Sequence, residues 1–220
     1  MDIATYIEHS LLNPDATIAD IEKGLVEATL YGFPAVCVSP LFIKTAVSKI
    51  DTSKMQLATV IGFPLGYSVI EAKVAEVIMS ILDGTDALHM VINTIAIKNN
   101  DWQYLGKELN AIMPIVNGKG KVFNVIIETS LCSKQELITC CEIYGAAGVH
   151  AVIAGTGYAE QGTTVETIEL LRQHLPNSIK ITAASGIKNY SFAMQFINAG
   201  ASRLICNNGV QIIAELAQQH

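Results

Sequence analysis

Short runs of β-branched and aliphatic residues alternate with amphipathic stretches along the whole chain. The apolar runs predict strands, because a parallel strand that is buried on both faces is apolar throughout. The expected strands are 3–12, 35–39, 56–62, 87–92, 122–128, 149–154, 179–183 and 203–206. The expected helices lie near 18–31, 40–50, 68–83, 102–113, 133–147, 163–174, 189–199 and 208–218.

Eight strands and eight helices in strict alternation indicate an α/β fold whose parallel strands are joined by right-handed crossovers. A closed (β/α)8 TIM barrel fits this count better than an open doubly wound sheet, which usually has fewer strands. No linker or low-complexity tract interrupts the chain, so residues 1–220 are expected to form a single domain.

Local signals mark several helix ends. Ser68 precedes Glu71, and Ser133 precedes Glu136, at the spacing of a capping box, which predicts a helix start at each. Glycine follows four of the expected helices, at Gly32, Gly84, Gly148 and Gly200. A left-handed residue is favoured at such positions, so these glycines predict helix ends.

The composition and charge of the chain limit the classes of function that the protein could have. The net charge of −6 argues against nucleic-acid binding, because that needs a basic face and none is visible in the sequence. The chain has no apolar stretch of membrane-spanning length, and its N-terminus lacks a signal-peptide layout. Its five cysteines include no CxxC spacing and are read as reduced thiols in the cytoplasm. No metal or cofactor is expected, and the partner is expected to be a small-molecule substrate, with the chain a monomer or homodimer.

Functional residues of such barrels lie at the C-terminal ends of the strands. The turns after the last three expected strands contain glycine, as Thr156-Gly157, Ser185-Gly186 and Asn207-Asn208-Gly209. Backbone N–H groups and a helix N-terminus in this region commonly bind phosphate. These residues are candidates for a phosphate site, and the alternative is that the glycines only form tight turns.

Sequence motifs in these segments carry a resemblance. They include YIEHSLL at 6–12, PDAT at 14–17, TVIGFPLG at 59–66, MVIN at 90–93, VIIET at 125–129 and SGI at 185–187. In order and spacing, over nearly the whole chain, they resemble the deoxyribose-phosphate aldolase family. That resemblance implies a class I aldolase, which cleaves 2-deoxyribose 5-phosphate reversibly to acetaldehyde and glyceraldehyde 3-phosphate.

The resemblance also implies which positions carry the chemistry. In the family a lysine on the sixth strand forms an imine, a second lysine on the seventh strand lowers its pKa, and an aspartate on the fourth strand relays protons. Here these positions are occupied by Ile153, Thr182 and His89, and a further common lysine is replaced by Asn13. Isoleucine has no nucleophile and no proton, so it cannot form an imine.

These replacements lead to the hypothesis of a divergent member that lacks the Schiff-base lysine. We expect its pocket to be repurposed for non-imine acid/base chemistry, of lyase, isomerase or cyclase type, on a small carbonyl or phosphorylated metabolite. The family's class I mechanism is then not expected. Histidine titrates near neutrality, so His89 is placed at the centre of this chemistry.

Other side chains are candidates to assist His89. Glu128 is expected to face it across the mouth as an orienting carboxylate or a base, and Tyr158 adds a hydroxyl. Cys37 is a candidate nucleophile if a positive group lies beside it. Each residue also has a purely structural interpretation. His89 and Cys37 would be a hydrogen-bonded core histidine and a packed thiol. Glu128 would hold a turn, and Tyr158 would line the wall.

Two other functions compete with this hypothesis. One is a catalytically inactive relative that binds a metabolite. The other is aldolase activity retained through a displaced lysine, Lys180, which lies two residues before Thr182 and therefore on the same inward row of the strand. A lysine at the solvated start of a strand is the simpler interpretation of Lys180.

Overall fold

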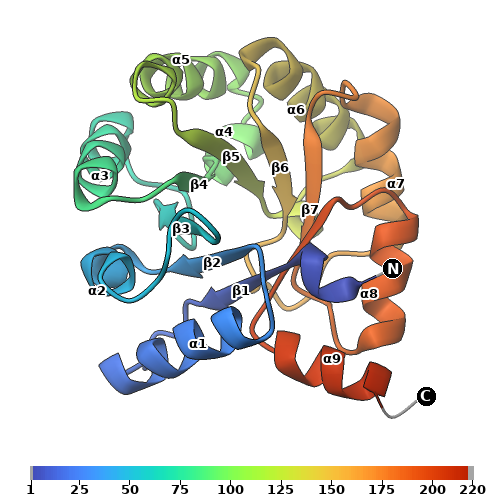
Figure 1. Cartoon of the computed structure of the whole chain (residues 1–220). Coiled ribbons are helices and arrows are strands. Elements are labelled where there is room, and N and C mark those ends of the chain that lie inside the picture. The colour runs from blue at the N-terminus through green and yellow to red at the C-terminus, as the bar shows by residue number, and fades with distance from the viewer. Residues whose placement is uncertain (1, 218–220) are drawn as a thin grey trace.

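Eight parallel strands close into a barrel in the order β1 to β8, in a computed structural model that describes residues 2–217. The strands are β1 (Ile7–Leu11), β2 (Ala35–Val38), β3 (Gln56–Ile61), β4 (Ala87–Val91), β5 (Val122–Ile127), β6 (Ala151–Ala154), β7 (Lys180–Ala184) and β8 (Arg203–Cys206). Figure 1 shows them at the centre of the molecule, with the helices around them. The predicted (β/α)8 TIM barrel is confirmed.

The helices follow the strands in alternation. They are α1 (Ile18–Leu30), α2 (Ile43–Val47), α3 (Ile70–Asp83), α4 (Thr94–Lys98), α5 (Trp102–Gly118), α6 (Lys134–Ala147), α7 (Val165–His174), α8 (Tyr190–Asn198) and α9 (Gly209–Ala217). Short 3-10 helices lie at η1 (Ile3–Tyr6), η2 (Pro40–Phe42) and η3 (Thr129–Leu131). No helix among the described residues is long and apolar enough to cross a membrane.

Several boundaries differ from the sequence expectation. The first strand starts at Ile7, because the Asp2 side chain accepts a hydrogen bond from the Ala4 N–H and starts the helix η1 instead. The Ser133 capping box is present. The one expected at Ser68 is wrong: α3 has Val69 at its N-cap, with no side-chain cap bond. The helix α4 was not predicted, and Asn93 caps it by accepting from the Ala96 N–H.

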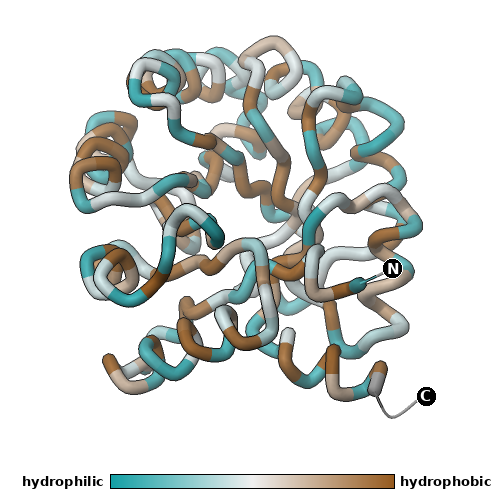
Figure 2. Tube along the Cα trace, viewed as in Figure 1, coloured by the Kyte–Doolittle hydropathy of each residue, from teal (hydrophilic) through white to brown (hydrophobic). Residues whose placement is uncertain are grey.

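Alternation along the strands divides the apolar residues into two groups. The larger group lies between the sheet and the helices and includes Val36, Leu88 and Val152. The smaller group fills the inside of the barrel and includes Cys37, Val60, Ala87, Ile126 and Ile153. The hydropathy-coloured trace shows hydrophobic colour along the central strands (Figure 2).

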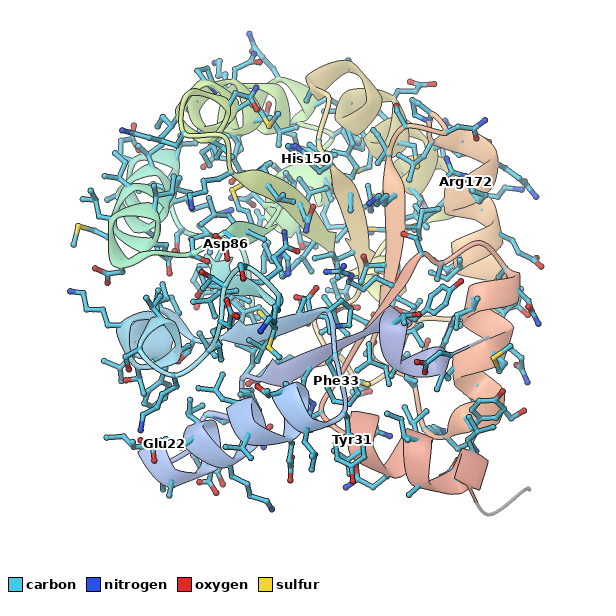
Figure 3. The ribbon with its side chains drawn as sticks, in the orientation of Figure 1. Glu22, Tyr31, Phe33, Asp86, His150 and Arg172 are labelled. Atoms are coloured by element: carbon cyan, nitrogen blue, oxygen red, sulfur yellow. The ribbon has the colours of Figure 1, made fainter. Side chains whose placement is uncertain are left out.

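The last helix is fixed against the start of the barrel. Phe33 and Tyr31 stack with their ring centroids 6.0 Å apart, and both lie between α1 and α9 in Figure 3. A Cβ atom added at Gly209 would lie 2.9 Å from Ile7 and 3.1 Å from Phe33. The first residue of α9 must therefore be glycine for the helix to approach this closely.

An ion pair is buried outside the barrel wall. Lys73 of α3 donates from Nζ to Glu108 Oε1 of α5 at 2.5 Å and to the Val91 carbonyl of β4 at 2.7 Å, and both charged side chains are 0% exposed. Burial lowers the pKa of Lys73 and raises the pKa of Glu108, and the attraction between the two opposes both shifts. The pair ties two helices to one strand.

We expect Lys73→Met to lower the free energy of unfolding by about 3–5 kcal/mol, because it leaves the Glu108 carboxyl buried without its partner. Urea denaturation at pH 7 measures this. The double variant Lys73→Met/Glu108→Leu is the control, and it should recover most of the loss because no isolated charge remains. A single variant as stable as the wild type would contradict the structural role of the pair.

Candidate functional site

A cavity of about 510 Å³ opens at the C-terminal ends of the strands, where this fold places its active sites. Its apolar lining comes from inside the barrel and includes Val60, Ile126 and Ile153. Its polar lining includes His89, Cys37, Ser10 and residues of the turns after β6, β7 and β8. The cavity is therefore a small, mixed pocket of the kind that binds a metabolite.

His89 projects from β4 into the barrel and is held by both ring nitrogens. Nε2 lies 2.6 Å from Glu8 Oε1 of β1, and Nδ1 lies 3.1 Å from Asn124 Nδ2 of β5. The ring is therefore fixed between a carboxylate on one side and an amide on the other. All three residues are buried. His89 thus lines the cavity as predicted, while its two partners were not identified from the sequence.

Glu8 connects His89 to a cation. Its Oε2 accepts from Arg203 Nη1 at 3.4 Å, and the same nitrogen donates to Gln56 Oε1 at 3.2 Å. Burial alone would raise the pKa of Glu8, but the charges and hydrogen bonds of His89 and Arg203 outweigh it, so the pKa is lowered. Glu8 is therefore an ionised carboxylate inside the barrel.

Cys37 lies beside this carboxylate. Burial, and then the negative charge of Glu8, raise the pKa of the thiol well above its ordinary value. A nucleophilic cysteine needs a nearby positive group to stabilise the thiolate, and here the neighbour is negative. In the structure Cys37 is therefore a neutral thiol, and the expected activation by His89 is not found.

Glu128 follows β5 but holds a turn. Its Oε2 accepts from the Thr156 N–H at 2.9 Å and from Thr156 Oγ1 at 2.7 Å, while its Oε1 accepts from Ser130 Oγ at 3.0 Å. Both carboxylate oxygens are thus occupied by the loop after β6 and by Ser130. The expected arrangement, with Glu128 facing His89, is wrong, because the β6 turn attracts the carboxylate.

Tyr158 reaches across the mouth of the barrel. Its hydroxyl donates to the Leu12 carbonyl at 3.2 Å, and its ring meets Phe63 edge-on at 5.3 Å between centroids. The side chain lines the cavity although 51% of the residue is exposed. Tyr158 links the loop after β6 to the loop after β1, so it contributes to the shape of the cavity opening.

The two residues that the sequence motifs placed at lysine positions lie side by side. Ile153 of β6 is the register partner of Thr182 of β7, and both are buried. Lys180 is the first residue of β7, is exposed, and pairs in register with Ala151 at the N-terminal end of the barrel. It is not among the residues that line the cavity, and those residues include no lysine.

Turns after β6, β7 and β8 form one side of the cavity. Lining residues from the predicted phosphate site are Thr156, Gly157, Ser185, Gly186, Asn207 and Asn208. Ser185 and Gly186 have positive φ values of 68° and 74°, so the backbone turns sharply at this point. Gly209 was also predicted for this site, but it packs against Ile7 and Phe33 and does not line the cavity.

Three side chains that could bind a metal ion come together at the base of the cavity. Glu8, Cys37 and His89 each offer one ligand atom, and these atoms all lie within 4.8 Å of one another. The sequence indicated no metal ligands, because the three residues come from β1, β2 and β4 and have no recognisable spacing. Only strand register brings them together.

Comparison with known proteins gives a consistent result. A deoxyribose-phosphate aldolase from Thermococcus gammatolerans is 40% identical over 215 residues, which cover 97% of this chain and 96% of that protein. A solved structure described as "QR15, an Aldolase" superposes with a TM-score of 0.94 at 32% identity, covering 100% of this chain and 98% of that one. A tetrameric deoxyribose phosphate aldolase from Aeropyrum pernix has a TM-score of 0.91 at 24% identity, with 99% and 92% covered. No protein-family model matches the chain.

These relatives correct the functional hypothesis drawn from the sequence. Other proteins that are 36–40% identical over at least 96% of this chain carry the same aldolase name. The expectations of non-imine acid/base chemistry centred on His89, and of a mechanism other than the family's, are contradicted. The geometry gives a physical reason, because both nitrogens of His89 are already bonded to Glu8 and Asn124.

The pairing of Glu8 can be tested through stability. We expect Glu8→Gln to lower the free energy of unfolding at pH 7 by about 3–5 kcal/mol, because the variant breaks a buried charged pair. In the folded protein the pKa of Glu8 lies below its ordinary value of 4.5. The part of the stability difference that comes from the charge of Glu8 is therefore fully present above pH 4.5, and it is lost as the pH falls through the folded pKa. Urea denaturation between pH 7 and pH 3 measures it.

Glu22→Gln is the control for this variant, because Glu22 pairs with Lys49 at the surface at 3.1 Å with both side chains well exposed. It should change stability by less than about 1 kcal/mol. If Glu8→Gln behaved like Glu22→Gln, the buried pair would not be a stabilising contact.

Proposed function

The chain belongs to the deoxyribose-phosphate aldolase family, and we propose that it is a lyase that cleaves or forms 2-deoxyribose 5-phosphate in the cavity at the barrel mouth. The observation that carries this proposal is the identity of 36–40% with relatives of that name over nearly the entire chain. The cavity supports it too, because it lies where this fold places active sites and is of a size for a small metabolite.

The phosphate of the substrate is assigned to the turns after β6, β7 and β8. Thr156, Gly157, Ser185, Gly186, Asn207 and Asn208 line one side of the cavity there. α9 begins directly after Asn208, and the N-terminus of a helix favours an anion. The aldehyde end of the substrate would then lie deeper, near Ile153 and His89.

We further propose that this member lacks the family's Schiff-base lysine. Ile153 lines the cavity at the position of that lysine, and Thr182 beside it occupies the position of the second. An imine requires an amine, so the reaction has to recruit another lysine. Lys180 begins β7 two residues before Thr182, at the exposed N-terminal end of the strand. Lys188 follows the cavity residue Ile187, and its Nζ lies 5.9 Å from the centre of the Phe192 ring.

One experiment tests both the aldolase activity and the identity of the lysine that forms the imine. We expect the purified chain to release glyceraldehyde 3-phosphate from 2-deoxyribose 5-phosphate, measured with a coupled NADH assay. Borohydride reduction in the presence of acetaldehyde should then trap an ethyl group on one lysine, which peptide mass spectrometry identifies. Lys180→Ala and Lys188→Ala form the matched pair: the variant of the trapped lysine loses both signals, and the other keeps them. No cleavage and no adduct would contradict the proposal.

The position of Ile153 gives a second test. Ile153→Lys restores an amine in the cavity, and burial should depress its pKa and make it nucleophilic. We expect this variant to gain an acetaldehyde adduct at residue 153 and to cleave the substrate at least tenfold faster than the wild type. Ile126→Lys, which also enters the cavity from a neighbouring strand, is the control and should gain no activity.

The proposal extends to the oligomeric state of the protein and its location in the cell. We propose a monomer or homodimer. Exposed apolar side chains favour the dimer: Leu30 of α1, and Met79 and Leu82 of α3, on the two helices that pack on either side of α2. Light scattering after size exclusion should give one or two chains per particle, and a tetramer would contradict this. A cytoplasmic location fits the five cysteines, which are all unpaired.

A further inference from the structure

Glu8, Cys37 and His89 form the one cluster of metal-ligating side chains in residues 2–217, and we propose that it binds a single zinc-like divalent cation at the base of the cavity. The three ligand atoms lie within 4.8 Å of one another and come from the rigid strands β1, β2 and β4. This site is additional to the proposed aldolase function, and no step of that function depends on it.

The donor set decides the class of ion. An imidazole, a carboxylate and a cysteine sulfur, which releases its proton to solvent when it binds the ion, match Zn²⁺ and its analogue Co²⁺. Mg²⁺ and Ca²⁺ prefer oxygen ligands only. Three protein ligands leave the fourth tetrahedral position open. That position faces the cavity, because Cys37 and His89 both line it.

The distances allow the ion to enter with small movements. Zinc bonds of about 2.0–2.2 Å to nitrogen and oxygen place these two atoms about 3.3 Å apart in a tetrahedron. His89 Nε2 and Glu8 Oε1 are 2.6 Å apart, so their hydrogen bond opens slightly as the ion takes the place of its proton. Glu8 uses its other oxygen for Arg203, which leaves Oε1 directed at the site.

Asn124 supplies independent support. Its Oδ1 is buried and has no hydrogen-bond partner, while its Nδ2 contacts His89 Nδ1 at 3.1 Å. Rotation of the amide by half a turn places Oδ1 against Nδ1, which then carries the proton and donates it. This is the tautomer that a metal-binding histidine requires, with Nε2 free to bind the ion and the other nitrogen held by a second residue. With the ion on Nε2, the ring proton stays on Nδ1, and the half-turn of the amide gives Asn124 Oδ1 a donor.

Cobalt provides the test, because tetrahedral Co²⁺ bound to a thiolate absorbs strongly in the visible and shows a thiolate-to-cobalt charge-transfer band in the near ultraviolet. Chelator-treated protein is titrated with Co²⁺ and then with Zn²⁺. We expect both absorptions at one ion per chain, and their loss when Zn²⁺ displaces Co²⁺. No such bands at millimolar Co²⁺ would overturn the proposal.

Variants locate the site. Cys37→Ser should abolish the charge-transfer band, and Cys206→Ser, which removes another buried thiol of the cavity lining, should keep it. Asn124→Leu should weaken binding about 10- to 100-fold, as expected when the residue that orients a metal-bound histidine is removed. A band that survives Cys37→Ser, or disappears in Cys206→Ser, contradicts the assignment.

A second measurement on the wild-type chain guards against variants that do not fold. Zn²⁺ should slow the alkylation of Cys37 at least tenfold, while Cys206 reacts at an unchanged rate, with both followed by peptide mass spectrometry. Equal rates at Cys37 with and without Zn²⁺ would refute the site. Both readouts are independent of aldol cleavage, so failure here and failure of the aldolase proposal are distinguishable.

Discussion

Pairing between β1 and β8 closes the barrel, so that each strand has an inner face enclosed by the other strands. Because side chains alternate along a strand, closure decides which polar groups must satisfy one another there. Glu8 and His89 are 81 residues apart in sequence, yet their side chains meet at 2.6 Å inside the barrel. A carboxylate removed from water needs such partners. The polar contacts inside the barrel are therefore arranged around the carboxylate of Glu8.

Periodicity predicted the architecture because it reports how each segment is buried. All eight expected strands occur, and the glycines Gly84 and Gly148 end α3 and α6 in the left-handed conformation. The errors lie where local hydrogen bonds override an apolar pattern. Ile3 and Ala4 continue the apolar run of β1, but the Asp2 cap turns them into a helix. α4 spans only five residues, too few to show a helical period.

The site was only partly predictable, for a related reason. His89 and Cys37 were identified because each occupies a recognisable place near the end of an expected strand, and both line the cavity. Glu8 and Asn124 were missed because their contacts depend on the register between strands that are distant in sequence. The functional hypothesis was wrong because it rested on Ile153 and a few other positions, which could not outweigh the agreement of relatives over the whole chain.

The charges inside the barrel connect these observations. Ile153 and Thr182, at the positions where the sequence motifs predicted two lysines, contribute no charge. Glu8 nevertheless remains ionised, so the compensating positive charge has to come from elsewhere. Arg203 supplies part of it at 3.4 Å, but its side chain is 29% exposed, and solvent weakens its attraction for the carboxylate. His89 adds a hydrogen bond to the same carboxylate at 2.6 Å. A cation bound between Glu8, Cys37 and His89 would supply positive charge beside the cavity that Ile153 lines.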